Sequence, residues 1–262
     1  MLLAVLTVAL YASLAALARL GYRAVLFPAP GEDAVSVPAG GELLRFAARD
    51  GARVHAVFLP PPPGAPVVVH FHGNGETVGD NVERGLAIRR AGLGVLLVEY
   101  RGYGVSRASG DPTERGLYLD GEAALDELGR RGVGPDRVMI WGTSLGTGVA
   151  AELASRGRAA RLLLVSPYTS IPRMAARFAP FLPMDSIVVD RFDTISKAPR
   201  LALPALVIHG DRDEVVPYAM GREVAAALPS ARLVTVAGGH HNDLFARDPS
   251  LLDAIAAHAL GR

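Results

Sequence analysis

Three short stretches of this chain carry residue types that could perform nucleophilic catalysis together. Ser144 lies in a Gly-Thr-Ser-Leu-Gly segment, Asp211 and Asp213 follow one apolar run, and His240 and His241 follow another. A serine hydroxyl is a weak nucleophile until a base accepts its proton, and that base needs an acid to orient it. The three stretches therefore predict a Ser-His-Asp site for acyl transfer. Their spacing alone leaves open which aspartate and which histidine take part.

The residues around Ser144 favour a nucleophile over an ordinary structural turn. An apolar stretch, Val138–Trp141, is typical of a short buried strand, and Thr147–Ser155 is typical of a helix rich in small residues. A serine at such a strand-to-helix turn is held in a strained backbone with its hydroxyl exposed. We expect side chains at the flanking glycines to collide with the turning chain and the neighbouring strand. The backbone N–H of Leu145 would lie at a helix N-terminus, where it can donate to a developing oxyanion.

The pattern of elements predicts a parallel sheet that carries these stretches at one edge. Apolar strands alternate with helices from residue 67 onward, and continuous apolar strands indicate a sheet covered on both faces. Ligands bind such sheets at the carboxyl ends of their strands. The predicted strands are Val67–Phe71, Val95–Tyr100, Val138–Trp141, Leu162–Val165, Ala205–His209 and Leu233–Val236, and the predicted helices are Gly79–Ala91, Thr113–Arg130, Thr147–Ser155, Tyr218–Leu228 and Pro249–Leu260.

Two further segments depart from this alternation. Glu42–Ala48 and Arg53–Leu59 read as strands joined by a hairpin turn at Asp50-Gly51. The interval between Pro167 and Pro204 is too long for a structureless loop, so we expect a small helical cap at about 167–203. Its apolar residues either line an acyl pocket or pack the cap onto the core, and the sequence does not separate these roles: Phe178, Phe181, Leu182, Pro183 and Met184.

The N-terminal segment is long and apolar enough to be a membrane anchor. Residues 1–18 are interrupted only by Thr7, Tyr11 and Ser13, and Arg19 and Arg23 follow. A stretch of this length just spans a bilayer as a helix. We therefore expect a single-pass anchor in residues 1–26, ahead of a catalytic domain in residues 27–262, with the membrane side open. A cleaved signal peptide and a buried core helix are the alternatives.

Composition sets further limits. The chain has 262 residues, half of them hydrophobic, which suits one α/β domain with a large core. A formal net charge of +1 gives no reason to expect nucleic acid as a partner, and no cysteine is present to serve as a nucleophile or zinc ligand. His70 and His72 lack the usual ligand spacing of a metal site, so no metal and no cofactor is expected.

Four motifs together resemble the α/β-hydrolase superfamily. They lie at 70–75 (His-Phe-His-Gly-Asn-Gly), 100–106 (Tyr-Arg-Gly-Tyr-Gly-Val-Ser), 142–146 and 209–213 (His-Gly-Asp-Arg-Asp). More narrowly the chain is similar to the abhydrolase-domain group of anchored serine hydrolases, which includes lysophospholipases and depalmitoylases. The resemblance implies the α/β-hydrolase fold, a mostly parallel central sheet with helices on both faces and a small cap.

The resemblance also assigns roles to individual residues. It implies that Ser144 is the nucleophile, Asp213 the acid and His241 the base, although His240 stands where the group usually has glycine. It implies that the backbone N–H groups of Asn74 and Leu145 form the oxyanion hole. His72 is expected to hold the Asn74 loop by hydrogen bonds.

The function expected from these residues is hydrolysis of carboxylic esters or thioesters through an acyl-enzyme. The substrate would be an acyl ester or an acylated molecule, with lipids among the candidates because of the anchor. A serine peptidase or amidase on the same fold is one alternative, because the same triad cleaves amides. A non-catalytic binding protein is the other, although its usual mark, a lost triad residue, is absent.

Overall fold

The computed structural model describes residues 1–31 and 34–262. In this part of the chain, eight strands form one sheet in the order β1-β2-β4-β3-β5-β6-β7-β8. Strand β2 pairs antiparallel with both neighbours, and the other described pairings are parallel. The strands are β1 (Glu42–Ala47), β2 (Arg53–Leu59), β3 (Val67–Phe71), β4 (Gly94–Val98), β5 (Val138–Thr143), β6 (Arg161–Val165), β7 (Ala205–Gly210) and β8 (Ala231–Val236).

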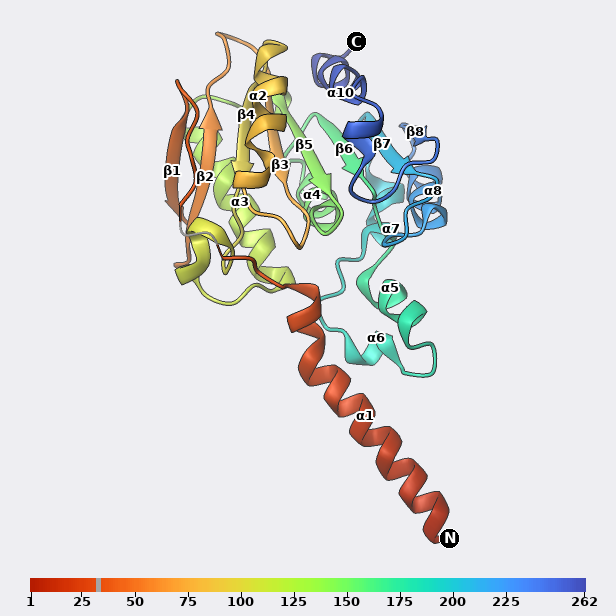
Figure 1. The fold of residues 1–262 in the computed structure, drawn as a ribbon. Helices are drawn as coiled ribbons and strands as arrows, with labels where there is room; N and C mark the ends of the chain where they lie inside the picture. The colour runs from red at the N-terminus through yellow and green to blue at the C-terminus, as the bar shows by residue number, and fades with distance from the viewer. Residues whose placement is uncertain (32–33) are drawn as a thin grey trace.

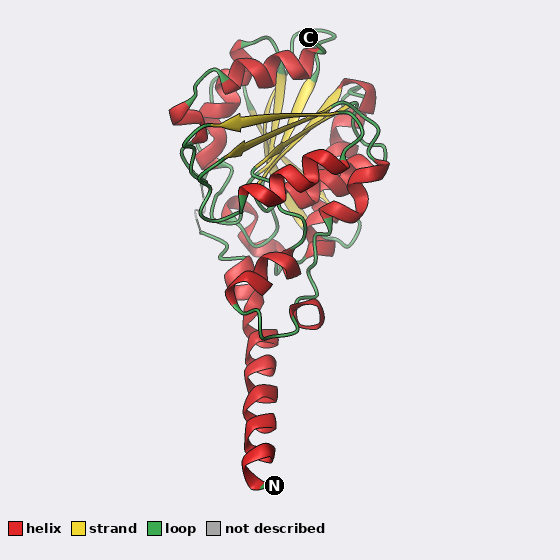
Figure 2. Cartoon of the chain, turned by 90° about the vertical axis from the view of Figure 1, so that its right-hand side faces the viewer, coloured by secondary structure: helices red, strands yellow, loops and turns green. Residues whose placement is uncertain are grey.

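Helices cover both faces of this sheet (Figures 1 and 2). The α-helices are α1 (Leu2–Leu26), α2 (Val82–Arg90), α3 (Glu114–Arg130), α4 (Gly146–Ser155), α5 (Ile171–Phe178), α6 (Met184–Ile187), α7 (Thr194–Lys197), α8 (Tyr218–Ala227), α9 (Leu244–Arg247) and α10 (Leu251–Leu260). Short 3₁₀ turns complete the described elements: η1 (Gly79–Asn81), η2 (Gly104–Ser109), η3 (Pro135–Arg137) and η4 (Ala198–Arg200).

The central strands β3 to β7 are mostly apolar because each contributes to two cores. In β3, Val67 and Val69 pack with α3, α4 and α8, whereas Val68 packs with α2 and α10 on the opposite face. In β5, Ile140 and Trp141 divide between the two cores in the same way. Successive side chains of a strand point to opposite faces, so a strand that is buried on both faces has few polar positions. The prediction of a doubly covered, mostly parallel sheet is confirmed.

Several predicted element boundaries shift by a few residues. The predicted hairpin of β1 and β2 is present. Strand β4 ends at Val98 instead of Tyr100, because Tyr100 begins a turn in which the Tyr103 N–H donates to its carbonyl at 3.1 Å. The interval predicted to be helical contains α5, α6, α7 and η4.

A buried ion-pair network joins the hairpin to α3. Arg101 donates to Asp120 at 2.6 Å and to Asp50 at 2.6 Å, and the Asp120 side chain is fully buried. A buried carboxylate is tolerated only when it is paired and hydrogen-bonded. This contact explains the arginine of the 100–106 motif as a structural residue.

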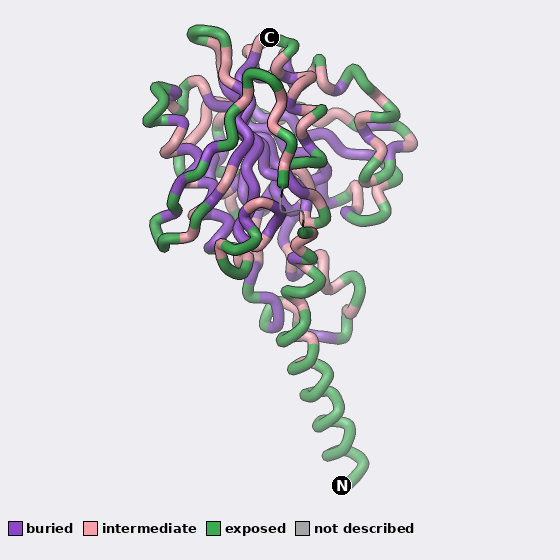
Figure 3. Tube along the Cα trace, turned by 60° about the vertical axis from the view of Figure 1, so that its left-hand side comes forward, coloured by how far each residue is buried: buried purple, intermediate pink, exposed green. Residues whose placement is uncertain are grey.

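The N-terminal helix projects from the domain (Figure 1), and its residues are largely exposed along its length (Figure 3). Within the described residues, α1 is the helix long and apolar enough to cross a membrane. It continues past Arg19 to Leu26, so its C-terminal part reaches the domain. There it packs beside α5 and α6, where Ala15, Ala18 and Tyr22 contact the small apolar cluster of Leu182, Ile187 and Val188.

Candidate active site

Ser144 occupies a strained turn between β5 and α4. Its φ is +49°, a left-handed conformation that side-chain-bearing residues rarely adopt, and its N–H donates to the Val165 carbonyl at 2.9 Å. A Cβ on Gly142 would lie 2.4 Å from the Gly146 carbonyl oxygen, and one on Gly146 would lie 2.0 Å from the Phe71 carbonyl oxygen. The expected collisions with the turning chain and the neighbouring strand are confirmed.

The structure brings Ser144, His241 and Asp213 into one hydrogen-bonded chain. His241 Nε2 lies 3.1 Å from Ser144 Oγ, and His241 Nδ1 lies 2.8 Å from Asp213 Oδ2. Ser144 directly follows β5, Asp213 follows β7 and His241 follows β8. Because these strands are parallel, their carboxyl ends meet at one edge of the sheet.

Asp213 is held as a carboxylate. Its Oδ1 accepts from the N–H groups of Val215 and Val216 at 2.9 and 2.7 Å, and its Oδ2 lies 3.3 Å from His209 Nε2. Burial opposes ionisation, but the hydrogen bonds from His209 and His241 outweigh it and place the pKa of Asp213 below its ordinary value. A carboxylate accepts hydrogen bonds only, so His241 must present a protonated Nδ1 to it.

The neighbouring aspartate and histidine make different contacts. Asp211 Oδ1 accepts from the Gly238 N–H at 2.6 Å, which closes the loop after β8. His240 Nδ1 lies 3.0 Å from Glu214 Oε2, and its side chain is 49% exposed. Neither side chain reaches Ser144.

The loop after β3 is held by a buried network around His72. His72 Nε2 lies 2.9 Å from Glu99 Oε1, and His72 Nδ1 lies 2.8 Å from the Gly73 carbonyl. Burial lowers the pKa of His72, but the hydrogen bond to Glu99 outweighs it and the net pKa is raised. The Tyr100 hydroxyl donates to the His72 carbonyl at 2.9 Å. The expected anchoring role of His72 is confirmed.

The two backbone groups predicted as oxyanion donors flank Ser144. In the described part of the chain, neither the Asn74 N–H nor the Leu145 N–H donates to another group. The Asn74 side chain donates from Nδ2 to the Leu26 carbonyl at 3.3 Å, which ties this loop to the end of α1. The Gly73 N–H donates to Glu76 Oε2 at 2.9 Å.

Two residues that support the site, His209 and Glu76, were not predicted from the sequence. His209 is fully buried, and its Nε2 donates to the Val216 carbonyl at 2.9 Å while facing Asp213. A Cβ on Gly221 would lie 2.0 Å from His209 Nδ1, so α8 leaves room for this ring only because it has glycine there. The i, i+4 spacing of His209 and Asp213 was the available signal. The contact between Glu76 and the Gly73 N–H has no comparable signature.

Two cavities of different polarity meet at Ser144 and Asn74. A cavity of about 600 Å³ is bounded by α1, α5, α6 and the loop before α8, with mostly apolar walls. A cavity of about 580 Å³ lies on the other side of Ser144 and contains Glu76, Asp80, Arg84 and His241. A bound substrate could therefore place an apolar part on one side of the serine and a polar part on the other.

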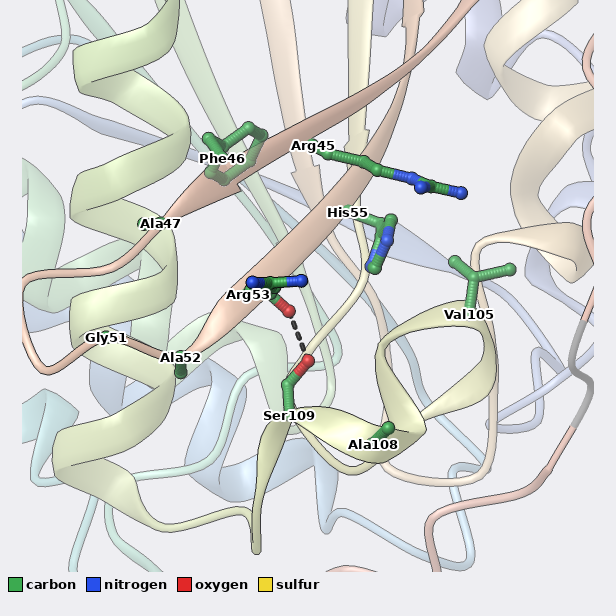
Figure 4. Close-up of a pocket in the computed structure, with 10 residues that line it drawn as sticks. All are labelled: Arg45, Phe46, Ala47, Gly51, Ala52, Arg53, His55, Val105, Ala108 and Ser109. Carbon is green, nitrogen blue, oxygen red and sulfur yellow. Dashed lines mark hydrogen bonds between the residues drawn. The ribbon is translucent and has the colours of Figure 1, made fainter.

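A third cavity, of about 840 Å³, lies between β1, β2 and η2 (Figure 4). Ser109 donates to the Arg53 carbonyl there, and His55 Nδ1 lies 3.1 Å from Ser106 Oγ. Burial, with a smaller contribution from Arg45, lowers the pKa of His55. None of the residues lining this cavity lines the two cavities at Ser144.

The described residues include no group of three or more His, Cys, Asp or Glu side chains arranged to hold a metal ion. His70 instead lies 3.2 Å from the Thr143 hydroxyl through Nε2, and burial places its pKa well below the ordinary value. His258 lies 3.0 Å from the Leu162 carbonyl.

Comparison with known proteins gives family matches over most of the chain. The family described as "Serine aminopeptidase, S33" matches residues 62–191, and the family described as "TAP-like protein" matches residues 188–258. An uncharacterized protein of Mycobacterium tuberculosis is 37% identical over 88% of this chain and 82% of its own length. Alpha/beta hydrolase domain-containing protein 17C of Xenopus tropicalis is 33% identical over 84% of this chain and 71% of its own length.

Solved structures share the fold at low sequence identity. A hydrolase from Pseudomonas aeruginosa superposes with a TM-score of 0.65 at 23% identity, covering 86% of this chain and 100% of that one. Est1E from Butyrivibrio proteoclasticus, solved with ferulic acid, gives a TM-score of 0.70 at 19% identity, covering 83% of this chain and 99% of that one. At these identities the likeness concerns the fold.

Proposed function

The chain belongs to the α/β-hydrolase superfamily, within its abhydrolase-domain group, and from that premise we propose that it is a serine hydrolase of acyl esters or thioesters. The hydrogen-bonded series Ser144–His241–Asp213 carries this proposal, because it has the order of nucleophile, base and acid that acyl transfer requires. The family assignment makes the protein a hydrolase; the bond it cleaves is our inference.

In the proposed reaction, His241 Nε2 accepts the proton of Ser144 as Oγ attacks the acyl carbonyl. The N–H groups of Asn74 and Leu145 stabilise the tetrahedral oxyanion, and the Asp213 carboxylate stabilises the imidazolium. His241 then protonates the leaving oxygen or sulfur. Water, deprotonated by His241, attacks the acyl-enzyme and releases the carboxylic acid.

The two cavities at Ser144 support an acyl substrate with ends of different polarity. The apolar cavity suits a hydrocarbon acyl chain, because burying its methylene groups contributes about 0.8 kcal/mol each. The polar cavity suits the alcohol or thiol leaving group, which must lie near His241 to receive a proton. Of the cap residues, Phe178 and Met184 line the cavity, whereas Leu182 packs in a small apolar cluster within the cap and against α1.

We also propose that α1 retains the protein at a membrane as a single-pass anchor. Its length, its apolar sequence and its exposure to solvent support this role over a buried core helix. Contacts between α1 and the cap favour a retained helix over a cleaved signal peptide, because cleavage would expose the cluster that α1 covers. N-terminal sequencing of the purified membrane fraction tests this, and a mature chain starting after Ala18 would contradict it.

Labelling with a fluorophosphonate probe, followed by peptide mass spectrometry, tests the proposed nucleophile. We expect covalent modification at Ser144 of the wild type and none in Ser144→Ala, whose turnover should fall by roughly 10⁴–10⁶-fold while the fold is retained. Ser144→Ala turnover above a few per cent of wild type would overturn the assignment.

Paired ester and amide substrates separate the proposed activity from the peptidase alternative. We expect hydrolysis of the ester and little of the matched amide, because the mostly apolar walls of the cavity offer few polar groups to bind a peptide backbone. A folded protein that neither labels nor hydrolyses either substrate would instead favour a binding protein on a hydrolase fold.

A further inference from the structure

The N-terminal helix forms part of the cavity that reaches Ser144. The cavity residues of α1 are Ala18, Gly21, Tyr22, Val25 and Leu26, which recur at helical spacing and so share one face. Ser144 and Leu145 line the same cavity, so these α1 residues share it with the proposed nucleophile. A helix that served only to tether the domain would not contribute a wall to this cavity.

Helix α5 supplies the opposite wall. Ile171, Met174, Ala175 and Phe178 line the cavity at positions i, i+3, i+4 and i+7, one apolar face of the helix. Arg173, on another face, forms an ion pair with Glu223 of α8. Helix α6 adds Met184 and Ile187. The space between α1 and the cap is therefore apolar on both sides.

Two sets of hydrogen bonds fix α1 in this position. The Asp190 carboxylate, which is almost fully buried, accepts from the Tyr22 hydroxyl at 2.7 Å, from Arg23 Nε at 2.7 Å and from the Glu114 N–H at 2.9 Å. The Leu26 carbonyl at the end of α1 accepts from the Asn74 side chain at 3.3 Å. The position of α1 is thus coupled to the cap and to the loop beside Ser144.

The cap lies alongside the apolar part of α1 and not only beside its charged end. The Tyr11 hydroxyl donates to the Phe181 carbonyl at 2.9 Å. The part of α1 before Tyr11 comprises about nine helical residues, or roughly 14 Å, which is too short for a hydrocarbon core of about 30 Å. A bilayer that receives the apolar part of α1 must therefore also receive the tip of the cap.

The cap tip has the side chains expected of a surface in lipid. Phe178 is 79% exposed and Phe181 is 61% exposed, and both lie at the end of the cap that adjoins α1. Large aromatic side chains left in water are unfavourable, whereas lipid tails solvate them. Phe178 also lines the cavity, so its ring stands where the cavity meets the surface.

We propose that α1, α5 and α6 form an acyl-chain channel that opens sideways into the bilayer, so that Ser144 receives a long acyl chain directly from the membrane. This inference rests on the proposed acyl hydrolase activity and adds to it a substrate class, a bilayer-resident molecule with a long acyl chain. The acyl chain of the substrate would lie between α1 and α5, with its carbonyl group at Ser144. The leaving group would project into the polar cavity.

Gly21 offers a test that does not disturb the fold. A Cβ at this position meets nothing within 4 Å, so a larger side chain can enter the cavity region without a clash. We would compare Gly21→Phe with Ala24→Phe, which adds the same ring to an exposed residue of α1 outside the cavity. Each full-length variant is reconstituted in phosphatidylcholine vesicles and assayed with p-nitrophenyl acetate and p-nitrophenyl palmitate.

We expect the ratio of palmitate to acetate hydrolysis to fall at least about tenfold in Gly21→Phe, because the added ring occupies space that the methylene groups of a long acyl chain need. Ala24→Phe should match wild type on both esters. Equal ratios of the two rates in all three proteins would overturn the channel while leaving the hydrolase intact. A wild type inactive on both esters and unlabelled at Ser144 would overturn the proposed function and the channel with it.

Discussion

At Ser144 the proposed chemistry depends on which histidine faces the hydroxyl. His241 bridges Ser144 and Asp213, whereas the exposed His240 faces Glu214. We expect His241→Ala to lower the rate of acylation by roughly 10⁴-fold or more, because no base then accepts the serine proton. His240→Ala, the matched control, should stay within about twofold of wild type. The rate of fluorophosphonate labelling measures acylation in both variants. A larger decrease in His240→Ala than in His241→Ala would make His240 the base.

The ionisation of Asp213 links the site to stability. Its pKa in the folded protein lies below the ordinary value, so the folded state binds this proton less readily than the unfolded chain. The Asp213 carboxylate therefore stabilises the folded state fully above the ordinary aspartate pKa of about 3.9. This stabilisation is lost as the pH falls through the lower pKa that Asp213 has in the folded protein. Below about pH 4, the free energy of unfolding of wild type should fall with decreasing pH more steeply than that of Asp213→Asn, by at most about 1.4 kcal/mol per pH unit.

Urea unfolding in detergent at pH 6, 5, 4 and 3 measures this difference. The two proteins should respond alike between pH 6 and 5 and diverge below. Parallel curves throughout would show that the carboxylate is not stabilised in the folded state.

Single residues also show where sequence reasoning ends. Ser144 was predictable because its glycines and flanking elements form a local pattern, and Gly146 has the close contact that the pattern implies. His209 and Glu76 act through contacts with Asp213 and with the Gly73 N–H, which depend on the folded loop. Apart from the i, i+4 spacing of His209 and Asp213, such contacts leave no pattern in the sequence.

At the scale of elements, the turn from β5 into α4 requires glycine for a steric reason. A Cβ on Gly146 would lie 2.0 Å from the Phe71 carbonyl oxygen, and backbone of a central strand cannot move away cheaply. We expect Gly146→Ala to lower the free energy of unfolding by about 2 kcal/mol or more, as overpacking does in cores. It should also reduce labelling of Ser144, because the turn must shift.

Gly129→Ala in α3 is the control for that substitution. A Cβ there meets nothing within 4 Å, and alanine restricts the unfolded chain, so stability should rise by about 0.4–1 kcal/mol. Urea unfolding measures both changes in the free energy of unfolding, the decrease in Gly146→Ala and the increase in Gly129→Ala. An unchanged free energy of unfolding in Gly146→Ala would contradict the close packing of β3 against α4.

The elements of the sheet were predictable, and the placement of α1 was not. Strands such as β3 and β5 are mostly apolar because side chains on both faces contribute to a core, and this pattern is visible in the sequence. The packing of α1 against the cap depends on Asp190, which is 167 residues from Arg23 along the chain. An apolar N-terminal helix gives the same sequence signal whether it stands free or packs on a domain.

For the whole molecule, α1 has two parts with separable roles. Residues 2–10 precede the first contact with the cap at Tyr11, whereas the later part lines the cavity and bonds to Asp190 and Asn74. Removal of residues 2–10 should weaken membrane retention, because the remaining apolar stretch is too short to span about 30 Å. It should leave the cavity wall in place.

Two truncations therefore give different results on a long-chain ester presented in detergent micelles, where membrane retention no longer matters. The variant lacking residues 2–10 should keep its rate within about threefold of wild type. The variant lacking residues 2–26 should lose roughly tenfold or more, because the wall and the bond to Asn74 are both removed. Urea unfolding of the truncated domain verifies that it is folded, and equal rates from two folded truncations would show that α1 serves only as an anchor.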